Sequence, residues 1–214
     1  MDKPLSELTR NRLLHAGGEV FAERGFRTAT VREICRRAKV NIASVNYHFS
    51  SKEELYASVL EYAYQQASSA FPNDPGATGE DTPERRLHNF IRNFLSRLLY
   101  EGRPAWYGML MAREIVEPTG ALDRIIERAI RPLHESLAGI VRDIVGEQTS
   151  GAKITRCVLS ILGQCLFYRH ARPVIARLHP SIHYEDKDIE RTAAHIAEFT
   201  LAALRHLSKQ GRKR

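Results

Sequence analysis

Polar and apolar side chains between residues 42 and 46 could contact the edges of DNA bases. Asn46 can form a bidentate pair of hydrogen bonds with adenine, and the hydroxyl of Ser44 can hydrogen-bond a base edge. The apolar side chains of Ile42 and Ala43 suit the methyl group of thymine. A short helix that carries such residues fits a major groove about 12 Å wide.

A second group of side chains around this segment could hold phosphates. The hydroxyls of Thr30 and Tyr47, the ring N–H of His48 and the ammonium of Lys52 all fall near expected helix ends. Such contacts would set the register of the protein on DNA without reading sequence. Taken singly, Tyr47 and His48 could equally complete a small hydrophobic core.

Capping signals predict the helices that position these residues. Thr30-Val31-Arg32-Glu33 and Ser51-Lys52-Glu53-Glu54 both have the spacing of a capping box, and Asn41 can cap a very short helix to about Tyr47. Two short helices joined by a tight turn, between longer helices, predict a helix-turn-helix unit.

The preceding helix is expected from about Glu7 to Arg24 and ends at Gly25, which we expect to be left-handed. Gly17 and Gly18 lower its helix propensity, so tertiary contacts must hold it, and the missing side chains would let a neighbour come close.

The charge of the chain is concentrated at its ends. The net charge is +7, and residues 1–52 hold 10 basic and five acidic side chains, whereas residues 53–208 hold 18 and 20. The last six residues add four basic groups. This distribution indicates that only the N-terminal part meets a polyanion.

The segment Thr9 to Leu55, TRNRLLHAGGEVFAERGFRTATVREICRRAKVNIASVNYHFSSKEEL, resembles the DNA-binding domain of the TetR family of bacterial regulators. The resemblance implies an all-helical homodimer that binds a palindromic operator and releases it when a small molecule binds the C-terminal domain. Of the positions in this segment, Thr30, Tyr47, His48 and Lys52 match phosphate-contacting residues of the family. Those that match base-facing positions are Arg32, Ile42, Ala43, Ser44 and Asn46.

Two residues depart from the family pattern. Lys39 occupies the turn position that is usually glycine, which costs about 1 kcal/mol if the residue is left-handed. Asn46 stands where an aromatic residue is common, so we expect it to contact a base rather than the DNA backbone.

Apolar spacing predicts an all-α protein of about nine helices. Prolines and glycines between residues 71 and 83 predict a linker, which gives three parts: a helix-turn-helix domain at 1–55, a connecting helix and linker at 56–82, and a helical effector-binding and dimerisation domain at 83–214. Later helices are expected at about 83–101, 104–117, 119–145, 152–178 and 187–209, with kinks at Pro132 and Pro173. The run from Met109 to Ile125 is similar to a subgroup with a CecR-like C-terminal domain.

The C-terminal part contains candidates for a dimer interface and for an effector pocket. The segment from Cys157 to Tyr168 is apolar on nearly all sides, which predicts that it is buried against its own domain and a second subunit. An apolar face of the last helix is expected to complete this dimer interface. That face comprises Ile189, Ala193, Ile196, Thr200, Ala203, Leu204 and Leu207. A stripe of aromatic and methionine side chains would suit an apolar or aromatic effector, which one charged group would orient. Such a stripe is also typical of ordinary core. These candidates are Phe90, Phe94, Trp106, Tyr107, Met109, Leu110, Met111, Arg113, Glu114 and Phe167.

Other classes of function find little support. No motif typical of an enzyme, a cofactor site or a metal site is present, and Pro180 interrupts the His179 and His183 pair. Without a signal peptide or a membrane-length apolar run, the chain is expected to be cytoplasmic, with Cys35, Cys157 and Cys165 as free thiols. We therefore expect a ligand-responsive repressor; the alternative is a helical small-molecule-binding or dimeric interaction module without sequence-specific DNA binding.

Overall fold

The computed structural model describes residues 3–70, 81–99 and 106–211, and these residues form helices joined by short turns, without strands. The predicted all-α class is confirmed. None of the helices in these ranges combines the length and the hydrophobicity needed to cross a membrane. The predicted linker lies mostly outside the described residues.

Contacts divide the chain into two units, which do not follow the sequential division predicted at the linker. The N-terminal unit comprises Met1–Ala67 and Gly102–Ile130, and the C-terminal unit comprises Ser68–Glu101 and Arg131–Arg214. Residues 106–130, expected from the sequence to belong to the effector-binding domain, therefore pack with the helix-turn-helix. The three-part division stays a prediction about function.

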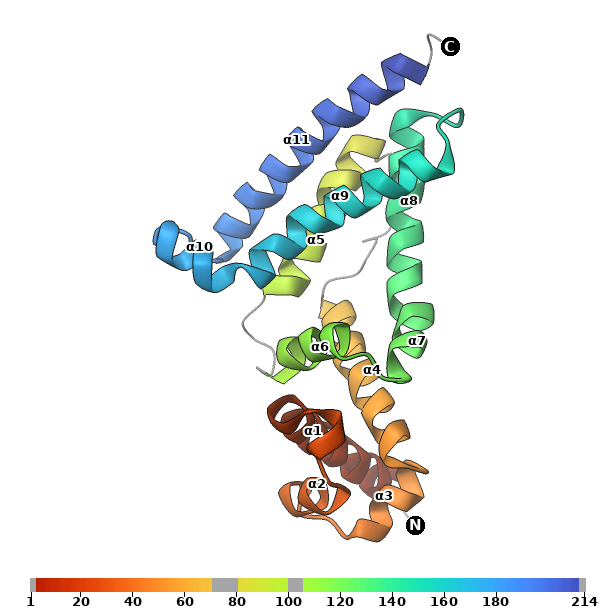
Figure 1. Ribbon diagram of the computed structural model, residues 1–214, viewed down its shortest axis with the longest axis vertical. Coiled ribbons are helices and arrows are strands. Elements are labelled where there is room, and N and C mark those ends of the chain that lie inside the picture. Colours follow the sequence, from red (N-terminus) through yellow and green to blue (C-terminus); the bar gives the residue numbers. More distant parts are fainter. Residues whose placement is uncertain (1–2, 71–80, 100–105, 212–214) are drawn as a thin grey trace. The chain divides into compact units, whose positions relative to one another are not determined.

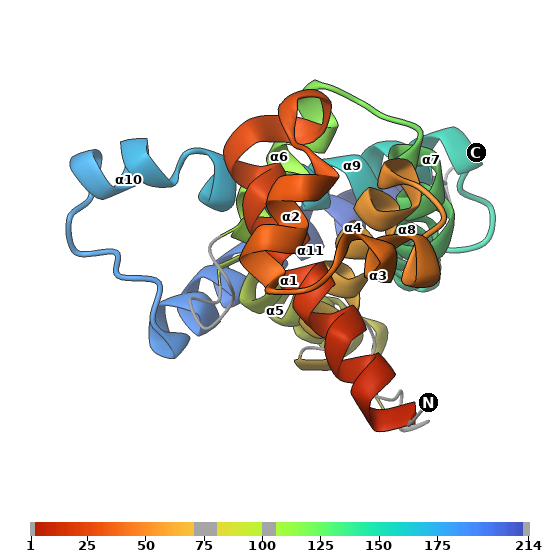
Figure 2. The ribbon, with the colours of Figure 1, turned by 90° about the horizontal axis from the view of Figure 1, so that it is seen from below.

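The N-terminal unit begins with α1 (Lys3–Thr28), followed by α2 (Val31–Ala38), α3 (Ile42–His48) and α4 (Lys52–Ala70). Figures 1 and 2 show α2 and α3 lying against α1. Leu13, Val20 and Phe21 form the apolar side of α1 and are fully buried. Further along the chain, α6 (Trp106–Val116), α7 (Ala121–Ile125) and the π-helix η1 (Ile126–Ile130) complete this unit, and α6 packs on α1.

Gly25 interrupts α1 as expected, although its conformation differs from the predicted one. Its φ of 76° is positive, but its ψ of 165° lies outside the left-handed helical region. Only glycine adopts this combination readily, because a Cβ would clash with the backbone. The chain then makes one further turn to Thr28, in which the N–H of Ala29 bonds the carbonyl of Gly25 at 3.2 Å.

The C-terminal unit contains α5 (Pro83–Leu99), α8 (Arg131–Val145), α9 (Gly151–His170), α10 (Arg172–Leu178) and α11 (Asp186–Gly211). Helices α5, α8, α9 and α11 all pack on one another around an apolar core (Figure 1). Both predicted interruptions occur: η1 precedes Pro132 in the first turn of α8, and α9 ends before Pro173 in α10. Proline causes them because it cannot donate the helical N–H bond.

The three cysteines are free thiols, as predicted. Cys35 and Cys165 are buried, and burial raises the pKa of Cys165 to about 12. At neutral pH that side chain therefore stays a neutral, apolar part of the core of the C-terminal unit.

Candidate nucleic-acid interface

Thr30 caps α2, as predicted, by accepting a hydrogen bond from the N–H of Glu33 at 3.2 Å. The reciprocal half of the predicted capping box is absent, because the Glu33 carboxylate instead contacts Arg24 at 2.9 Å. Ser51 likewise caps α4 at 3.1 Å, while the Glu54 carboxylate binds Arg124. In both boxes a long-range cation displaces the local bond.

Lys39 ends α2 in the left-handed conformation, with φ 54° and ψ 47°. Its N–H bonds the carbonyl of Arg36, and the N–H of Val40 bonds that of Cys35, which is the Schellman pattern of helix termination. The Lys39 carbonyl accepts a bond from Arg12 at 3.2 Å. The residue thus makes the turn that the family usually assigns to glycine.

Asn41 caps α3 through its side-chain oxygen, which accepts the N–H of Ala43 at 3.0 Å. Val45 and Phe49 are almost fully buried and hold the helix on the unit. On the opposite side, Ile42 is 47% and Tyr47 67% exposed, and Ala43 and Asn46 are exposed as well, whereas Ser44 is half-buried. The outward face of α3 therefore carries the side chains that were expected to read bases.

The expected phosphate-contacting residues are not equally accessible. Tyr47 and Thr30 are exposed, as is Arg32 at the start of α2. His48 is half-buried with its ring edge-on to Tyr47 at 4.9 Å, and burial, aided by the charge of Arg10, lowers its pKa. His48 is therefore neutral at pH 7 and would donate one N–H to a phosphate rather than a full charge.

Lys52 holds the start of α4 against the end of α1. Its ammonium donates to the carbonyl of Arg27 at 3.2 Å and lies 4.7 Å from the centre of the Phe26 ring. Because an ammonium has three donors, this contact leaves hydrogens for a phosphate. The sequence indicated the charge but not this structural contact.

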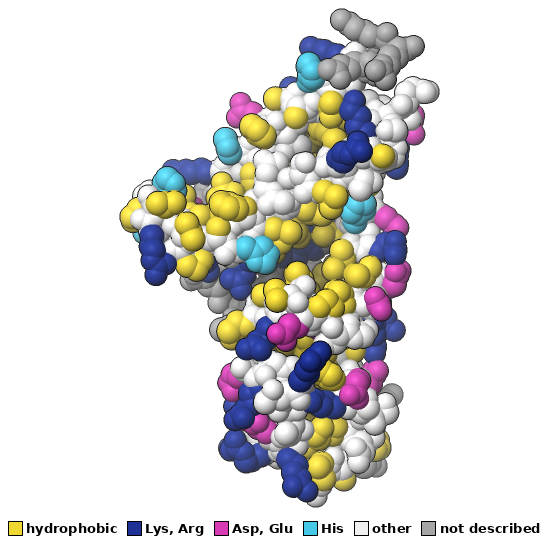
Figure 3. All heavy atoms as spheres, in the orientation of Figure 1, with side chains coloured by type: hydrophobic (Ala, Val, Ile, Leu, Met, Phe, Trp, Pro, Cys, Tyr) yellow, Lys and Arg dark blue, Asp and Glu magenta, His cyan; other side chains and the backbone are white. Residues whose placement is uncertain are grey.

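Several basic side chains of the N-terminal unit are neutralised within it. Arg37 makes two bonds to Glu23, at 2.7 and 2.9 Å, and also lies near Glu19 and Glu33. Among the described residues, exposed cations on α1, α2 and the following turn that form no ion pair are instead Arg10, Arg12, Arg27, Arg32, Arg36 and Lys39. Figure 3 shows Lys and Arg side chains over these helices, with Asp and Glu between them.

The candidate effector residues do not share one environment. Trp106, Leu110 and Glu114 are buried in the N-terminal unit, where Tyr107 and Met111 also pack, while Met109 and Arg113 are exposed on the same helix. In the C-terminal unit, Phe90 is buried, Phe94 is half-buried with its ring 6.2 Å from that of Phe90, and Phe167 is exposed.

Glu114 is a fully buried carboxylate that joins three elements. It accepts the hydroxyl of Tyr56 in α4 at 2.7 Å, and the N–H and hydroxyl of Thr119 after α6, both at 2.9 Å. Three donors compensate for the loss of hydration of the carboxylate. Glu114 therefore has a structural role in the N-terminal unit, which the sequence did not indicate.

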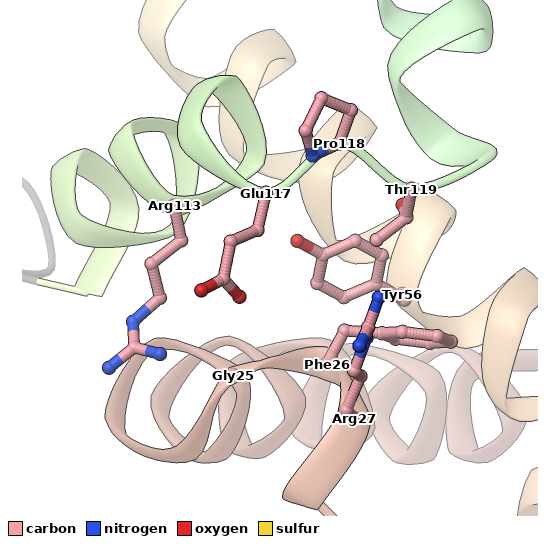
Figure 4. A pocket seen from close by; sticks show the side chains of 8 residues that line it. All are labelled: Gly25, Phe26, Arg27, Tyr56, Arg113, Glu117, Pro118 and Thr119. Carbon is pink, nitrogen blue, oxygen red and sulfur yellow. The ribbon is translucent and has the colours of Figure 1, made fainter.

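A cavity of about 190 Å³ lies beside this network (Figure 4). Tyr56 and Thr119 line one part of it, and Arg113 of α6 and Glu117, which follows α6, extend toward it from above Gly25. Its remaining lining residues are Phe26, Arg27 and Pro118. It is small and formed by residues that hold α1, α4 and α6 together.

Two protein families match the chain. The family described as bacterial regulatory proteins of the tetR family matches residues 13–59. The family described as the C-terminal domain of the HTH-type transcriptional dual regulator CecR matches residues 83–204.

Curated relatives cover most of the chain. The HTH-type transcriptional dual regulator CecR of Shigella flexneri is 26% identical over 178 residues, which is 79% of each chain. The HTH-type transcriptional repressor NicS of Pseudomonas putida is 27% identical over 180 residues, which is 80% of each.

Solved structures share the fold. A transcriptional regulator from Rhodococcus sp. Rha1 matches with a TM-score of 0.64 at 22% identity, covering 91% of this chain and 96% of that one. A linker-substituted mutant of HlyIIR matches with a TM-score of 0.63 at 25% identity, covering 87% and 97%.

Proposed function

The chain belongs to the TetR family of bacterial regulators, with a CecR-type C-terminal domain, and it is a transcriptional regulator rather than an enzyme. From this premise we propose that it is a repressor that binds a palindromic operator as a homodimer. A small apolar or aromatic effector releases the protein from the operator. The similarity to NicS, which is named a transcriptional repressor, supports this sign of regulation.

The observation that carries the DNA-binding role is the outward face of α3. Its exposed Ile42, Asn46 and Tyr47 are set on a helix whose other side is buried through Val45 and Phe49. A helix fixed in this way can enter the major groove without losing its own packing. Asn46, Ser44, Ile42, Ala43 and Arg32 contact base edges, and Thr30, Tyr47, His48 and Lys52 contact phosphates.

The dimer forms through exposed apolar faces of α9 and α11. Leu159 and Phe167 on α9 are 58% and 61% exposed, and Phe199 on α11 is 63% exposed. Leu159, Gly163 and Phe167 follow at intervals of four and so share one side of α9. The face of α11 that was predicted for this contact is instead mainly internal, because Ile189, Ala193, Ile196, Thr200 and Leu204 are buried in the fold.

The effector site is proposed around α5. Phe90 and Phe94 lie there, and the guanidinium of the buried Arg97 is 5.5 Å from the centre of the Phe94 ring. These side chains suit a planar apolar molecule. The α6 candidates Trp106, Tyr107, Met109, Leu110, Met111, Arg113 and Glu114 belong to the N-terminal unit and are not assigned to this site, and Phe167 is exposed on α9.

The test begins with selection of bound duplexes from a random pool and titration of the selected duplex at several salt concentrations. Specific binding with a steep salt dependence is expected. The logarithm of the binding constant falls by about 0.9 for each tenfold rise in salt concentration, for every phosphate that the protein neutralises. The selected sequence should be a palindrome with half-sites about 34 Å apart. Weak binding that ignores sequence would favour the interaction module without operator recognition.

The sign of regulation requires a second measurement. A reporter gene placed behind the selected operator should be more active without the protein than with it. Lower activity without the protein would show activation and contradict the repressor assignment.

A further inference from the structure

Trp106, the sole tryptophan of the chain, packs on the two consecutive glycines in the middle of α1. A Cβ added to Gly18 would lie 2.6 Å from three atoms of the indole ring. A Cβ on Gly17 would meet Val59 of α4 at 3.0 Å. We call this recess, formed by Gly17 and Gly18, the glycine notch. Because glycine is a poor helix former, the notch lowers the propensity of α1 and in return permits close approach.

The ring fills the notch as a rigid apolar group. Trp106 is only 6% exposed, and its ring lies edge-on to that of His15 at 6.3 Å. His15 in turn bonds the hydroxyl of Tyr62 in α4 at 2.9 Å. The first turn of α6 is therefore fixed against α1, and His15 joins α1 to α4.

The other end of α6 is fixed to the same helices by polar contacts. Arg113 donates to the carbonyl of Glu23 at 3.3 Å, next to the interruption of α1 at Gly25. The adjacent Glu114 fixes this end of α6 to α4, because the hydroxyl of Tyr56 in α4 donates to its buried carboxylate. With both ends held, α6 cannot shift along α1 without breaking a contact.

Helix α1 packs on α2 and α3, so its position sets that of the reading helix. From α6 the chain continues through α7 and η1 directly into α8 of the C-terminal unit. We propose that Trp106 is a positioning residue for operator binding: its ring in the glycine notch fixes α1, and with it α3, to the segment that leads to the other unit. This inference rests on the proposed function, since it concerns how the two reading helices of a dimer are placed on a palindrome.

The test is Gly18→Ala. Alanine favours the helix, but its Cβ must displace the indole ring. With the duplex selected by the wild-type protein as probe, we expect binding of the full palindrome to weaken by about tenfold, within the usual range of coupling between sites. Binding of a single half-site should change less than about twofold, because α3 and its own contacts are untouched. The emission of Trp106 should shift to longer wavelength.

A matched control and a rescue accompany this variant. Gly139→Ala makes the same change in the middle of α8, where an added Cβ meets nothing within 4 Å, and should leave both affinities unchanged. Adding Trp106→Leu to Gly18→Ala makes room for the Cβ and should restore most of the palindrome affinity. Trp106→Leu alone should weaken palindrome binding several-fold, with half-site binding retained.

Three results would overturn the assignment. If both Gly18→Ala and Trp106→Leu bind the palindrome as tightly as wild type, the placement of the two reading helices does not depend on the contact between Trp106 and the glycine notch. Equal losses for palindrome and half-site would show a damaged reading unit instead of a displaced one. If the wild-type protein selects no duplex at all, the proposed function fails and this inference fails with it.

Discussion

Asn46 and Tyr47 are adjacent in α3 but are expected to contact different parts of DNA. Asn46→Ala should relax the preference at one base position, at a cost of about 1–3 kcal/mol for the preferred base, because a bidentate pair is lost. Tyr47→Ala should weaken binding to all duplexes alike, because it removes a phosphate contact. Fluorescence anisotropy with single-base variants of the selected duplex measures both effects.

Tyr47→Phe is the matched control for the phosphate contact, since it removes only the hydroxyl. It should reproduce most of the loss seen with alanine. Equal, sequence-independent losses in Asn46→Ala and Tyr47→Ala would contradict this division of roles.

Lys39 is held in a conformation that costs a residue with a Cβ about 1–2 kcal/mol. Lys39→Gly should therefore raise the free energy of unfolding of the N-terminal unit by about 1 kcal/mol, part of the gain being offset by the greater freedom of glycine when unfolded. Urea unfolding followed by the fluorescence of Trp106 measures this. Lys39→Ala keeps the backbone cost and should give no gain; a gain equal to that of glycine would show that the side chain, not φ, was responsible.

His48 gives the N-terminal unit a pH-dependent stability of known sign. Burial lowers its folded pKa below the ordinary value of about 6.5, so the unfolded chain takes up more protons below that pH. The stability contributed by neutral His48 is present above about pH 6.5 and is lost as the pH falls below it. Between pH 7.5 and 5.5, urea midpoints should fall more for wild type than for His48→Gln; equal falls would contradict this.

At the scale of elements, the hydroxyl of Tyr56 joins α4 to α6. Tyr56→Phe leaves the buried Glu114 with one donor fewer, which should destabilise the N-terminal unit by about 1–3 kcal/mol in urea unfolding. Tyr62→Phe removes a hydroxyl from the same helix, but its bond to His15 is exposed, so the loss should stay below about 0.5 kcal/mol. Similar losses in both variants would argue against a special role for the buried carboxylate.

Helix ends could be predicted because their causes are local. Thr30, Asn41 and Ser51 bond N–H groups two or three residues away, so the spacing in the sequence is sufficient. The carboxylates of Glu33 and Glu54 could not be assigned in this way. Their partners Arg24 and Arg124 are brought near by tertiary packing, which local spacing does not encode.

The face that a helix buries was harder to predict. Helix α11 has apolar side chains on more than one side, and periodicity alone does not say which side meets its own fold. In α3 the outward side was proposed correctly: Val45 and the following Phe49, four residues apart, are buried, whereas Ile42, Asn46 and Tyr47 are exposed. The DNA-facing set was therefore proposed from the sequence with the right exposure, apart from the half-buried Ser44, His48 and Lys52.

At the scale of the whole molecule, the exposed apolar faces of α9 and α11 predict assembly. Phe199→Glu places a charge on the proposed interface and should convert the dimer to a folded monomer in sedimentation at micromolar concentration, because Phe199 is exposed within one chain. Palindrome binding should weaken with it.

Val116→Glu on α6 is the control, since it puts the same charge on another exposed apolar side chain. This variant should remain dimeric. A wild-type monomer at micromolar concentration, or a Phe199→Glu variant that still dimerises, would contradict the proposed interface.

The effector site stays a proposal, because the sequence gives the types of its side chains but not which of them pack together. Trp106 was a reasonable candidate by type, but the glycines that receive it lie 88 residues earlier in the chain, counted from Gly18, and nothing in the local pattern joins the two. A binding site assembled from distant helices depends on packing, whereas the reading helix is contained in seven consecutive residues.

The interruption of α1 at Gly25 has a genetic consequence. No other amino acid readily adopts its backbone angles, and a Cβ there would also lie 2.9 Å from the Arg113 guanidinium. We expect that nearly every missense change at codon 25 disturbs how α1 leads into α2, although Gly25 is not among the residues proposed to touch DNA. A selection for cells that have lost regulation should recover this codon as often as those of the reading helix.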